Sequence, residues 1–206
     1  MEVRMTREQR REETRRLIRE AAVSQFAGGG FAGTSAEKIA DAAGYTRGAF
    51  YANYPNKQAL LLDLVQDRLN SEIQVWQQLT EGFEDLDELL EAFRRRSENF
   101  DLKGVWSMLL AESALHALRD KDFAVGYSNV QQRMSKTYEK LFQTLFHKLG
   151  LQPPLPLDEF GDALLALFRS NRLVRKNNGA AQSVPFSPEL LIQFIRGMIA
   201  ISEPVK

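Results

Sequence analysis

The sequence predicts an all-α fold. Nearly every segment of the 206 residues repeats apolar side chains at spacings of three and four, and Gly, Pro and Asp residues separate these segments. No sustained alternation of apolar and polar residues predicts a strand. With 44% hydrophobic and 26% charged residues, the chain is typical of soluble globular proteins, and its length fits one domain or two small ones.

The first predicted helix runs from about Thr6 to Ala27. Its Ile18, Ala22 and Phe26 recur at a spacing of four and therefore share one face, while arginines cover the other. We expect the three glycines at 28–30 to end this helix.

A helix-turn-helix is expected next. Thr34 lies three residues before Glu37, which is the spacing of a capping box, and the pattern predicts a helix over about 35–43. Gly44 ends this helix at a position where a positive φ favours Gly. A second short helix over about 46–52 follows at once, and two short helices joined by a tight turn form a helix-turn-helix.

The remaining segments are also predicted to be helical. Asn56 is a good N-cap for a long helix that reaches about Leu79 and is long enough to belong to two structural units. Its apolar stripe consists of Leu62, Val65, Leu69, Ile73, Trp76 and Leu79. Further helices are expected at 87–100, 104–119, 122–149, 157–176 and 187–202. The polar, Gly-containing segment 175–185 predicts a mobile connection.

The composition excludes several classes of site. The chain has no cysteine, which excludes disulfides and thiolate metal sites. Its two histidines, His116 and His147, lie far apart without partners at metal-ligand spacing, so we expect neither a metal nor another cofactor. No run of about 18 apolar residues could span a membrane, and the charged amino terminus lacks the apolar region of a secretory signal. We therefore expect a cytoplasmic protein that makes no membrane contact.

The net charge of zero hides an uneven distribution. Residues 1–60 carry ten Lys and Arg against seven Asp and Glu, whereas residues 61–206 carry seventeen against twenty. A basic amino-terminal part is a mild indication of a polyanionic partner. A solvated charged helix explains the same numbers equally well.

The stretch GYTRGAFYANYPNK at 44–57 holds three tyrosines and one phenylalanine. Each residue of a helix is turned by about 100° from its neighbour, so Arg47 and Tyr51 share a face and Phe50 points elsewhere. We expect Phe50 in a small core with Phe26, Ile39 and Leu60. We expect Tyr51 and Tyr54 to face outward, which is either an ordinary exposed position or a DNA-facing one.

The same stretch has the chemistry of a DNA-binding helix. Tyr often donates to phosphate oxygens, and Arg pairing with guanine is the commonest specific base contact. Lys57 opposes the macrodipole in the first turn of its helix, a position that a bound phosphate makes favourable. Gly48 and Ala49 are small enough for the helix backbone to approach DNA closely.

Residues 15–62, RRLIREAAVSQFAGGGFAGTSAEKIADAAGYTRGAFYANYPNKQALLL, resemble the amino-terminal domain of TetR-family transcriptional regulators. The resemblance covers about a quarter of the chain. It lies in the Ala-rich first helix, Phe26, Thr34-Ser35, Ile39-Ala40, Ala43-Gly44, Gly48, Tyr51 and Asn56-Lys57. Tyr45 departs from the small aliphatic residue usual after the turn glycine, and its direction is open. The triple glycine is looser than the family's usual charged loop.

The resemblance implies a homodimer that binds a double-stranded DNA operator. It places Thr34, Tyr51, Tyr54 and Lys57 at phosphates. It places Tyr45, Thr46, Arg47, Ala49 and Asn53 at or near base edges. Ser35, Lys38 and Gly48 complete the predicted interface.

The resemblance also implies a DNA-binding domain at 1–60, joined by the long helix to a ligand-binding and dimerisation domain at 61–206. Pocket candidates are Phe93, Trp106, Leu109, Leu110, Ser113, Phe123, Tyr127, Val130, Met134, Phe168 and Asn171, although most are expected to be plain core. Dimer candidates are Leu164, Leu167, Leu191, Phe194, Ile195 and Met198, with plain core again the alternative. An aromatic and Met-rich lining with few interior charges suits a largely apolar ligand.

Three functions are compared. The expected one is a homodimeric repressor that a small apolar ligand releases from a palindromic operator. A small helical enzyme lacks support, because no nucleophile elbow, phosphate loop or His–carboxylate pair occurs, and Glu112 or Asp162 can be structural or pocket groups. The third is a helical protein-interaction module without DNA binding.

Overall fold

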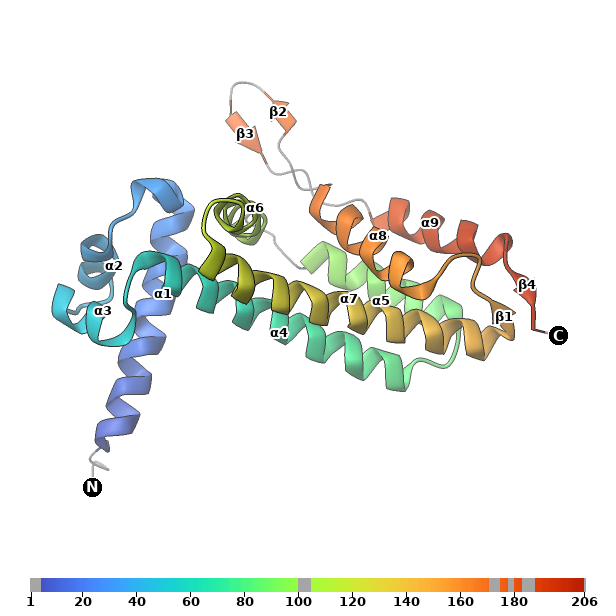
Figure 1. The fold of residues 1–206 in the computed structure, drawn as a ribbon, viewed down its shortest axis with the longest axis horizontal. Helices are drawn as coiled ribbons and strands as arrows, with labels where there is room; N and C mark the ends of the chain where they lie inside the picture. Colours follow the sequence, from blue (N-terminus) through green and yellow to red (C-terminus); the bar gives the residue numbers. More distant parts are fainter. Residues whose placement is uncertain (1–4, 100–104, 171–174, 178–179, 183–187, 206) are drawn as a thin grey trace.

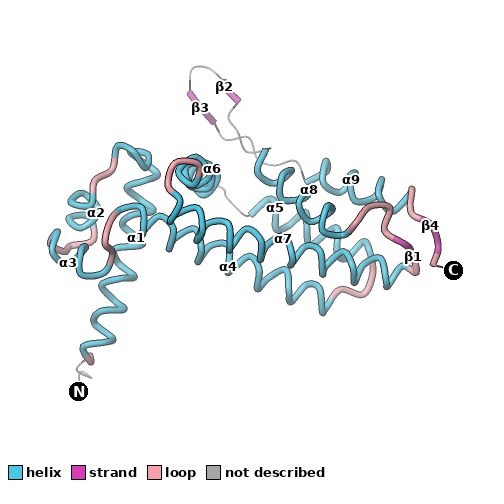
Figure 2. The backbone as a smooth tube through the Cα atoms, in the orientation of Figure 1, coloured by secondary structure: helices cyan, strands magenta, loops and turns pink. Residues whose placement is uncertain are grey.

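The computed structural model describes residues 5–99, 105–170, 175–177, 180–182 and 188–205, and it confirms the all-α class (Figure 2). The helices are α1 (Arg7–Gly33), α2 (Ala36–Ala42), α3 (Arg47–Asn53), α4 (Lys57–Gly82), α5 (Leu86–Asn99), α6 (Val105–Ala117), α7 (Lys121–Leu149), α8 (Leu157–Ser170) and α9 (Pro188–Ala200). The strands are β1 (Leu151–Gln152), β2 (Arg175–Asn177), β3 (Ala180–Gln182) and β4 (Glu203–Pro204).

The molecule has a small head at one end of an elongated helical bundle (Figure 1). Helices α1, α2 and α3 form the head, and the amino-terminal half of α1 projects away from it. Helix α4 leaves the head and runs along the bundle beside α7. Helix α8 packs on α7 and α9 packs on α5, while α6 lies between the head and the bundle. Helix α4 is therefore continuous between the part that carries α3 and the part expected to bind a ligand.

The first helix is longer than expected and kinked. Gly28 and Gly29 remain helical, and the break occurs at Gly30, whose φ of 68° and ψ of 167° are non-helical. A final turn follows and buries Phe31, whose ring centroid lies 5.4 Å from that of Phe26. A positive φ is unstrained only for Gly, so Gly30 allows the chain to turn and place Phe31 in the core.

The capping box expected at Thr34 is wrong by one residue. The N-cap of α2 is Ser35, whose side chain accepts from the backbone N–H of Lys38 at 3.2 Å. The Thr34 hydroxyl is buried and donates to the carbonyl oxygens of Gly30 at 2.8 Å and Gln25 at 3.1 Å. It thus fixes the kinked end of α1 instead of the start of α2.

Helix α4 begins and packs as the sequence predicts. The Asn56 side chain caps it by accepting from the N–H of Ala59 at 2.7 Å. Val65, Leu69, Ile73 and Trp76 of the predicted stripe are buried, and Leu62 and Leu79 are partly buried against the core.

An aromatic cluster fills the bundle where α4, α5, α7 and α8 meet. The Trp76 ring lies 4.5 Å from Phe93, and the Phe142 ring lies 4.2 Å from Phe160. Helix α8 approaches α7 closely at Gly161, where an added Cβ would lie 2.8 Å from the carbonyl oxygen of Ser135. Only a glycine fits at this contact without moving a backbone.

The segment expected as a mobile connection at 175–185 contains two strands. Strand β2 pairs antiparallel with β3, and the hairpin projects from the side of the bundle near α8 and α9 (Figure 1). The predicted helix 157–176 is described as far as Ser170. Within the described part of the chain, no helix combines the length and apolar content needed to cross a membrane.

Candidate nucleic-acid interface

Phe50 is the residue within α3 that packs in the core of the head. Phe50 is fully buried with Phe26, Ile39 and Leu60, as the sequence predicts. Thr46 caps the helix by accepting from the N–H of Ala49 at 3.3 Å. The opposite face of α3 is left exposed.

The exposed face of α3 carries a cation beside an aromatic ring. The side chain of Arg47 is 66% exposed, and Tyr51 is 44% exposed. The guanidinium carbon of Arg47 lies 5.4 Å from the centroid of the Tyr51 ring, which confirms that the two share a face. Arg47 also pairs with Glu37 of α2, with 2.9 Å between Nη1 and Oε1.

The remaining predicted base-edge residues surround this pair. Gly44 turns the chain with a φ of 75°, and the N–H of Tyr45 donates to the Ala40 carbonyl at 2.9 Å. The Tyr45 side chain is half-buried, so it belongs partly to the head and partly to its surface. Gly48 is exposed, and a Cβ there would meet no atom closer than the Thr46 hydroxyl at 3.7 Å. The surface beside Arg47 therefore carries no protruding side chain at Gly48 and is accessible.

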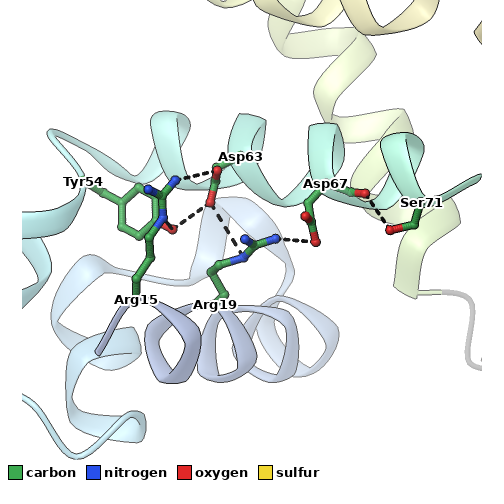
Figure 3. A network of polar contacts seen from close by, with 6 residues as sticks. All are labelled: Arg15, Arg19, Tyr54, Asp63, Asp67 and Ser71. Atoms are coloured by element: carbon green, nitrogen blue, oxygen red, sulfur yellow. Dashed lines mark hydrogen bonds and ion pairs between the residues drawn. The ribbon is translucent and has the colours of Figure 1, made fainter. Parts of the chain in front are cut away.

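Tyr54 does not face outward as expected. It is 3% exposed, and its hydroxyl donates to Asp63 Oδ2 at 2.7 Å and accepts from Arg15 Nε at 3.0 Å (Figure 3). Arg15 also donates to Asp63 Oδ1 at 2.7 Å, and Arg19 pairs with Asp67 at 2.6 Å. Burial, and then the Asp63 carboxylate, raise the pKa of the Tyr54 hydroxyl above its usual range. Tyr54 thus joins the end of α3 to α1 and α4 inside the head.

Lys57 is also engaged inside the head. Its ammonium donates to the carbonyl oxygens of Phe31 at 2.5 Å and Thr34 at 2.8 Å, and it lies 4.3 Å from the Phe31 ring centroid. Burial lowers the pKa of this ammonium, and the Glu112 carboxylate opposes the shift. Lys57 therefore holds the kinked end of α1 against the start of α4.

Two further side chains that were predicted to contact DNA form hydrogen bonds with backbone carbonyls. Lys38 donates from Nζ to the Gly33 carbonyl at 3.2 Å. Asn53 donates to the Ala49 carbonyl at 2.9 Å, while its Oδ1 is buried without a hydrogen-bond donor.

Sequence reasoning missed three arginines of α1 as interface candidates. Arg7, Arg10 and Arg11 line a cavity of about 690 Å³ together with Asn53, at the end of α3. They belong to the projecting half of α1 and share this cavity with Ala52 and Asn53 of α3. The excess of basic residues in 1–60 was the signal, but only the fold brings these three beside α3.

The pocket candidates are mostly packed side chains. Phe93, Leu109, Ser113, Phe123, Tyr127, Val130 and Met134 are buried, and Trp106 and Leu110 are partly buried. The side chain of Phe168 and residue Asn171 lie outside the described part. A cavity of about 1420 Å³ lies elsewhere, between the projecting half of α1 and α4, and among the candidates it is Trp106 that lines it.

The interior of the bundle is more charged than expected. Glu72 is buried, and its Oε1 pairs with Arg68 Nη1 at 2.9 Å while its Oε2 accepts from Arg96 Nε at 2.8 Å. The Arg68 guanidinium carbon lies 5.7 Å from the Trp106 ring centroid. Composition did not predict this cluster, because the three residues lie on two helices that meet only in the fold.

Most dimer candidates lie inside the protomer. Leu164, Leu191, Ile195 and Met198 are buried, Phe194 is partly buried, and the side chain of Leu167 lies outside the described part. The apolar stripe of α9 packs within the protomer against α5 and α8, which is the plain-core alternative. The outer face of α9 carries the exposed Leu190 and Gly197, and the exposed Ile201 follows the helix.

Comparison with known proteins finds a family model that matches the head and the start of α4. Residues 18–64 match the family model described as bacterial regulatory proteins of the tetR family. No curated protein sequence matches the chain.

Solved structures share the whole fold. A protein assigned to the TetR family from Mesorhizobium loti is 20% identical, with a TM-score of 0.72 over 96% of this chain and 99% of that one. Salmonella enterica GusR is 20% identical, with a TM-score of 0.66 over 91% and 95%. The regulator FadR from Bacillus subtilis, solved in complex with stearoyl-CoA, is 17% identical, with a TM-score of 0.61 over 76% and 83%. These matches show that the chain shares the fold of these structures.

Proposed function

We propose that the chain is a TetR-family regulator, a homodimeric DNA-binding repressor that a small ligand releases from a palindromic operator, because residues 18–64 match the tetR-family model. The observation that supports DNA binding most strongly is the exposed face of α3. This face presents Arg47 and Tyr51 beside small residues, while Phe50 packs in the core of the head. A helix with accessible donors, and with small side chains that let its backbone approach DNA closely, suits the major groove.

In this proposal the predicted contacts divide into two groups. Arg47, with Thr46, Ala49 and Tyr45 beside it, reads base edges, and Tyr51 donates to a phosphate. Arg7, Arg10 and Arg11 neutralise phosphates next to the end of α3, which makes binding salt-dependent. Thr34, Tyr54 and Lys57 support the head from inside, so their substitution acts on stability first.

We place the dimer interface on the outer face of α9. Leu190, Phe194, Gly197 and Ile201 follow one another at spacings of four, three and four, so they share one side of the helix. Leu190 and Ile201 are exposed large apolar residues in the isolated chain, and a second copy of α9 would cover them.

Helix α6 is suited to couple a ligand to the head. Its Leu109 and Ser113 are buried toward the bundle, whereas the His116 ring lies 6.1 Å from Phe31 of the head and 4.7 Å from Phe123 of α7. A ligand that moves α6 or α4 would tilt α3. Two recognition helices must lie about 34–36 Å apart to enter successive major grooves, so a tilt shifts the population away from the DNA-binding shape. By linkage, operator DNA weakens ligand binding by the same factor.

The effector proposed here is small and largely apolar. The packed aromatic and Met side chains of α5, α6 and α7 would separate to admit it, as happens when a ligand selects a minor open state. The division into a DNA-binding part at 1–60 and a ligand-binding part at 61–206 belongs to the same proposal, with α4 crossing the boundary.

A gel shift with DNA from upstream of the protein's own gene, titrated with salt, tests the function. We expect a sequence-specific complex whose affinity falls steeply as salt rises. Binding without sequence preference at any salt would favour the alternative, a helical interaction module without DNA recognition. Repression and its release are then measured with a reporter gene placed behind the bound DNA.

A further inference from the structure

We propose that Glu37 of α2 is a specificity-determining residue, which holds Arg47 of α3 in the orientation that reads a base. The inference rests on the proposed DNA-binding function. It concerns a carboxylate on the DNA-facing side of the head, where a negative charge would ordinarily oppose binding to phosphates.

The Glu37 carboxylate is itself fixed in place. It accepts from its own backbone N–H and from the Ser35 side chain, and these two contacts, with the Arg47 guanidinium, lower its pKa. Glu37 therefore stays ionised throughout the neutral range. The Glu37 side chain is 44% exposed, so these hydrogen bonds at the start of α2, and not burial, orient the carboxylate.

Arg47 is held on two sides. Glu37 Oε1 lies 2.9 Å from its Nη1, and the Tyr51 ring centroid lies 5.4 Å from its guanidinium carbon. An arginine loses much rotamer freedom when it binds a base, and a side chain that is already oriented loses less. The contacts come from two helices, so they also fix α2 relative to α3.

The ion pair leaves Arg47 able to bind a base. A guanidinium has five N–H donors in a planar fork, and the contact with Glu37 is made through Nη1. The side chain remains two-thirds exposed. The other edge of the fork can therefore donate to O6 and N7 of guanine while Glu37 holds Nη1.

The negative charge of Glu37 also acts against the wrong complexes. On non-specific DNA, Arg47 would turn toward a phosphate, and Glu37 opposes this by repelling the phosphate and retaining the guanidinium. Glu37 therefore lowers affinity for non-specific DNA while it supports affinity for the correct base. Both effects raise the ratio of specific to non-specific affinity.

The test compares this ratio for the wild-type chain, three variants and one control variant. Operator duplexes are first selected from a randomised DNA library with the wild-type protein. Affinities for the selected duplex and for a scrambled one are then measured at equal salt for the wild type, Glu37→Gln, Arg47→Ala and the double variant. Asp41→Asn is the matched control, because it removes one exposed carboxylate from the same helix. Thermal unfolding confirms that each variant is folded.

We expect Glu37→Gln to reduce the ratio by about tenfold and Asp41→Asn to leave it unchanged. In the Arg47→Ala background, Glu37→Gln should have no further effect on the ratio, because there is no guanidinium to hold. A ratio that is unchanged or higher in Glu37→Gln would overturn the inference while leaving DNA binding established. A wild-type protein that selects no sequence would instead refute the proposed function itself.

Discussion

Replacing Tyr54 with Phe separates a structural role for this residue from a DNA-binding one. The hydroxyl donates to Asp63 and accepts from Arg15, and it is buried, whereas a phosphate contact would need it at the surface. The change keeps the ring and leaves no cavity, so the hydrogen bonds alone are lost.

The size of the effect follows from these contacts. A hydrogen bond to a charged group contributes about 1.5–3 kcal/mol. Asp63 keeps its bond to Arg15, and its side chain is 24% exposed, so water can replace part of the loss. We therefore expect Tyr54→Phe to lower the free energy of unfolding by about 1.5–2 kcal/mol, which for a chain of this length is a decrease in Tm of about 3–8 °C.

Tyr51→Phe is the matched control, since the same chemical change is made on the exposed face of α3. Stability is measured by urea unfolding at one protein concentration, because the proposed dimerisation would make it concentration-dependent. Tyr54→Phe should lose stability and keep its operator affinity when folded. Tyr51→Phe should keep its stability and bind the operator about tenfold more weakly, as expected for a lost bond to phosphate. The reverse pattern would place Tyr54 on the DNA and refute the reasoning.

Three further outcomes are expected. Because the pKa of Tyr54 is raised from 10.0, the folded state retains this proton longer than the unfolded one, so the free energy of unfolding should fall as pH rises above about 10. In urea titrations at alkaline pH, the free energy of unfolding of Tyr54→Phe should fall less steeply with pH than that of the wild type. Parallel pH dependences of the two proteins would contradict the assignment. Gly161→Ala should destabilise by about 1–3 kcal/mol because its Cβ meets the Ser135 carbonyl, whereas Gly28→Ala, with open space around it, should stabilise by about 0.5–1 kcal/mol. Equal effects in thermal unfolding would count against the close contact of α7 and α8. Leu190→Asp should convert the proposed dimer to a monomer in analytical ultracentrifugation, and a variant that stays dimeric would rule out the interface on α9.

Local features of this fold could be predicted from the sequence, because they depend on residues close together in the chain. The Asn56 cap, the burial of Phe50 and the shared face of Arg47 and Tyr51 all follow from helical geometry over one or two turns. The family resemblance of the head rests on the same short-range pattern and is confirmed by the match over 18–64.

The errors concern residues whose partners are distant in the chain. Tyr54 was predicted to face outward from its position on α3 alone, but its hydroxyl forms hydrogen bonds with Arg15 of α1 and Asp63 of α4 inside the head. The stripe of α9 was expected either at a partner or in plain core, and the bundle buries most of it. Periodicity identifies an apolar face without saying what covers it.

The site could be predicted only in part for the same reason. Glu37 looked like half of a capping box, and its contact with Arg47 depends on the angle between α2 and α3. In the sequence, Arg7, Arg10 and Arg11 only contributed to the excess of basic residues in 1–60. The fold is what places them beside Asn53.

Base-resolved binding by Arg47→Ala tests the central claim most directly. On a selected operator, each base pair is substituted in turn and the affinity of wild type and variant is measured at one salt concentration. If α3 reads DNA through Arg47, the variant loses about 1–3 kcal/mol of discrimination at one base pair in each half-site. Its discrimination at the other base pairs is unchanged. An equal loss on every sequence would contradict the account, because it would make Arg47 a phosphate contact and leave α3 without its reading residue.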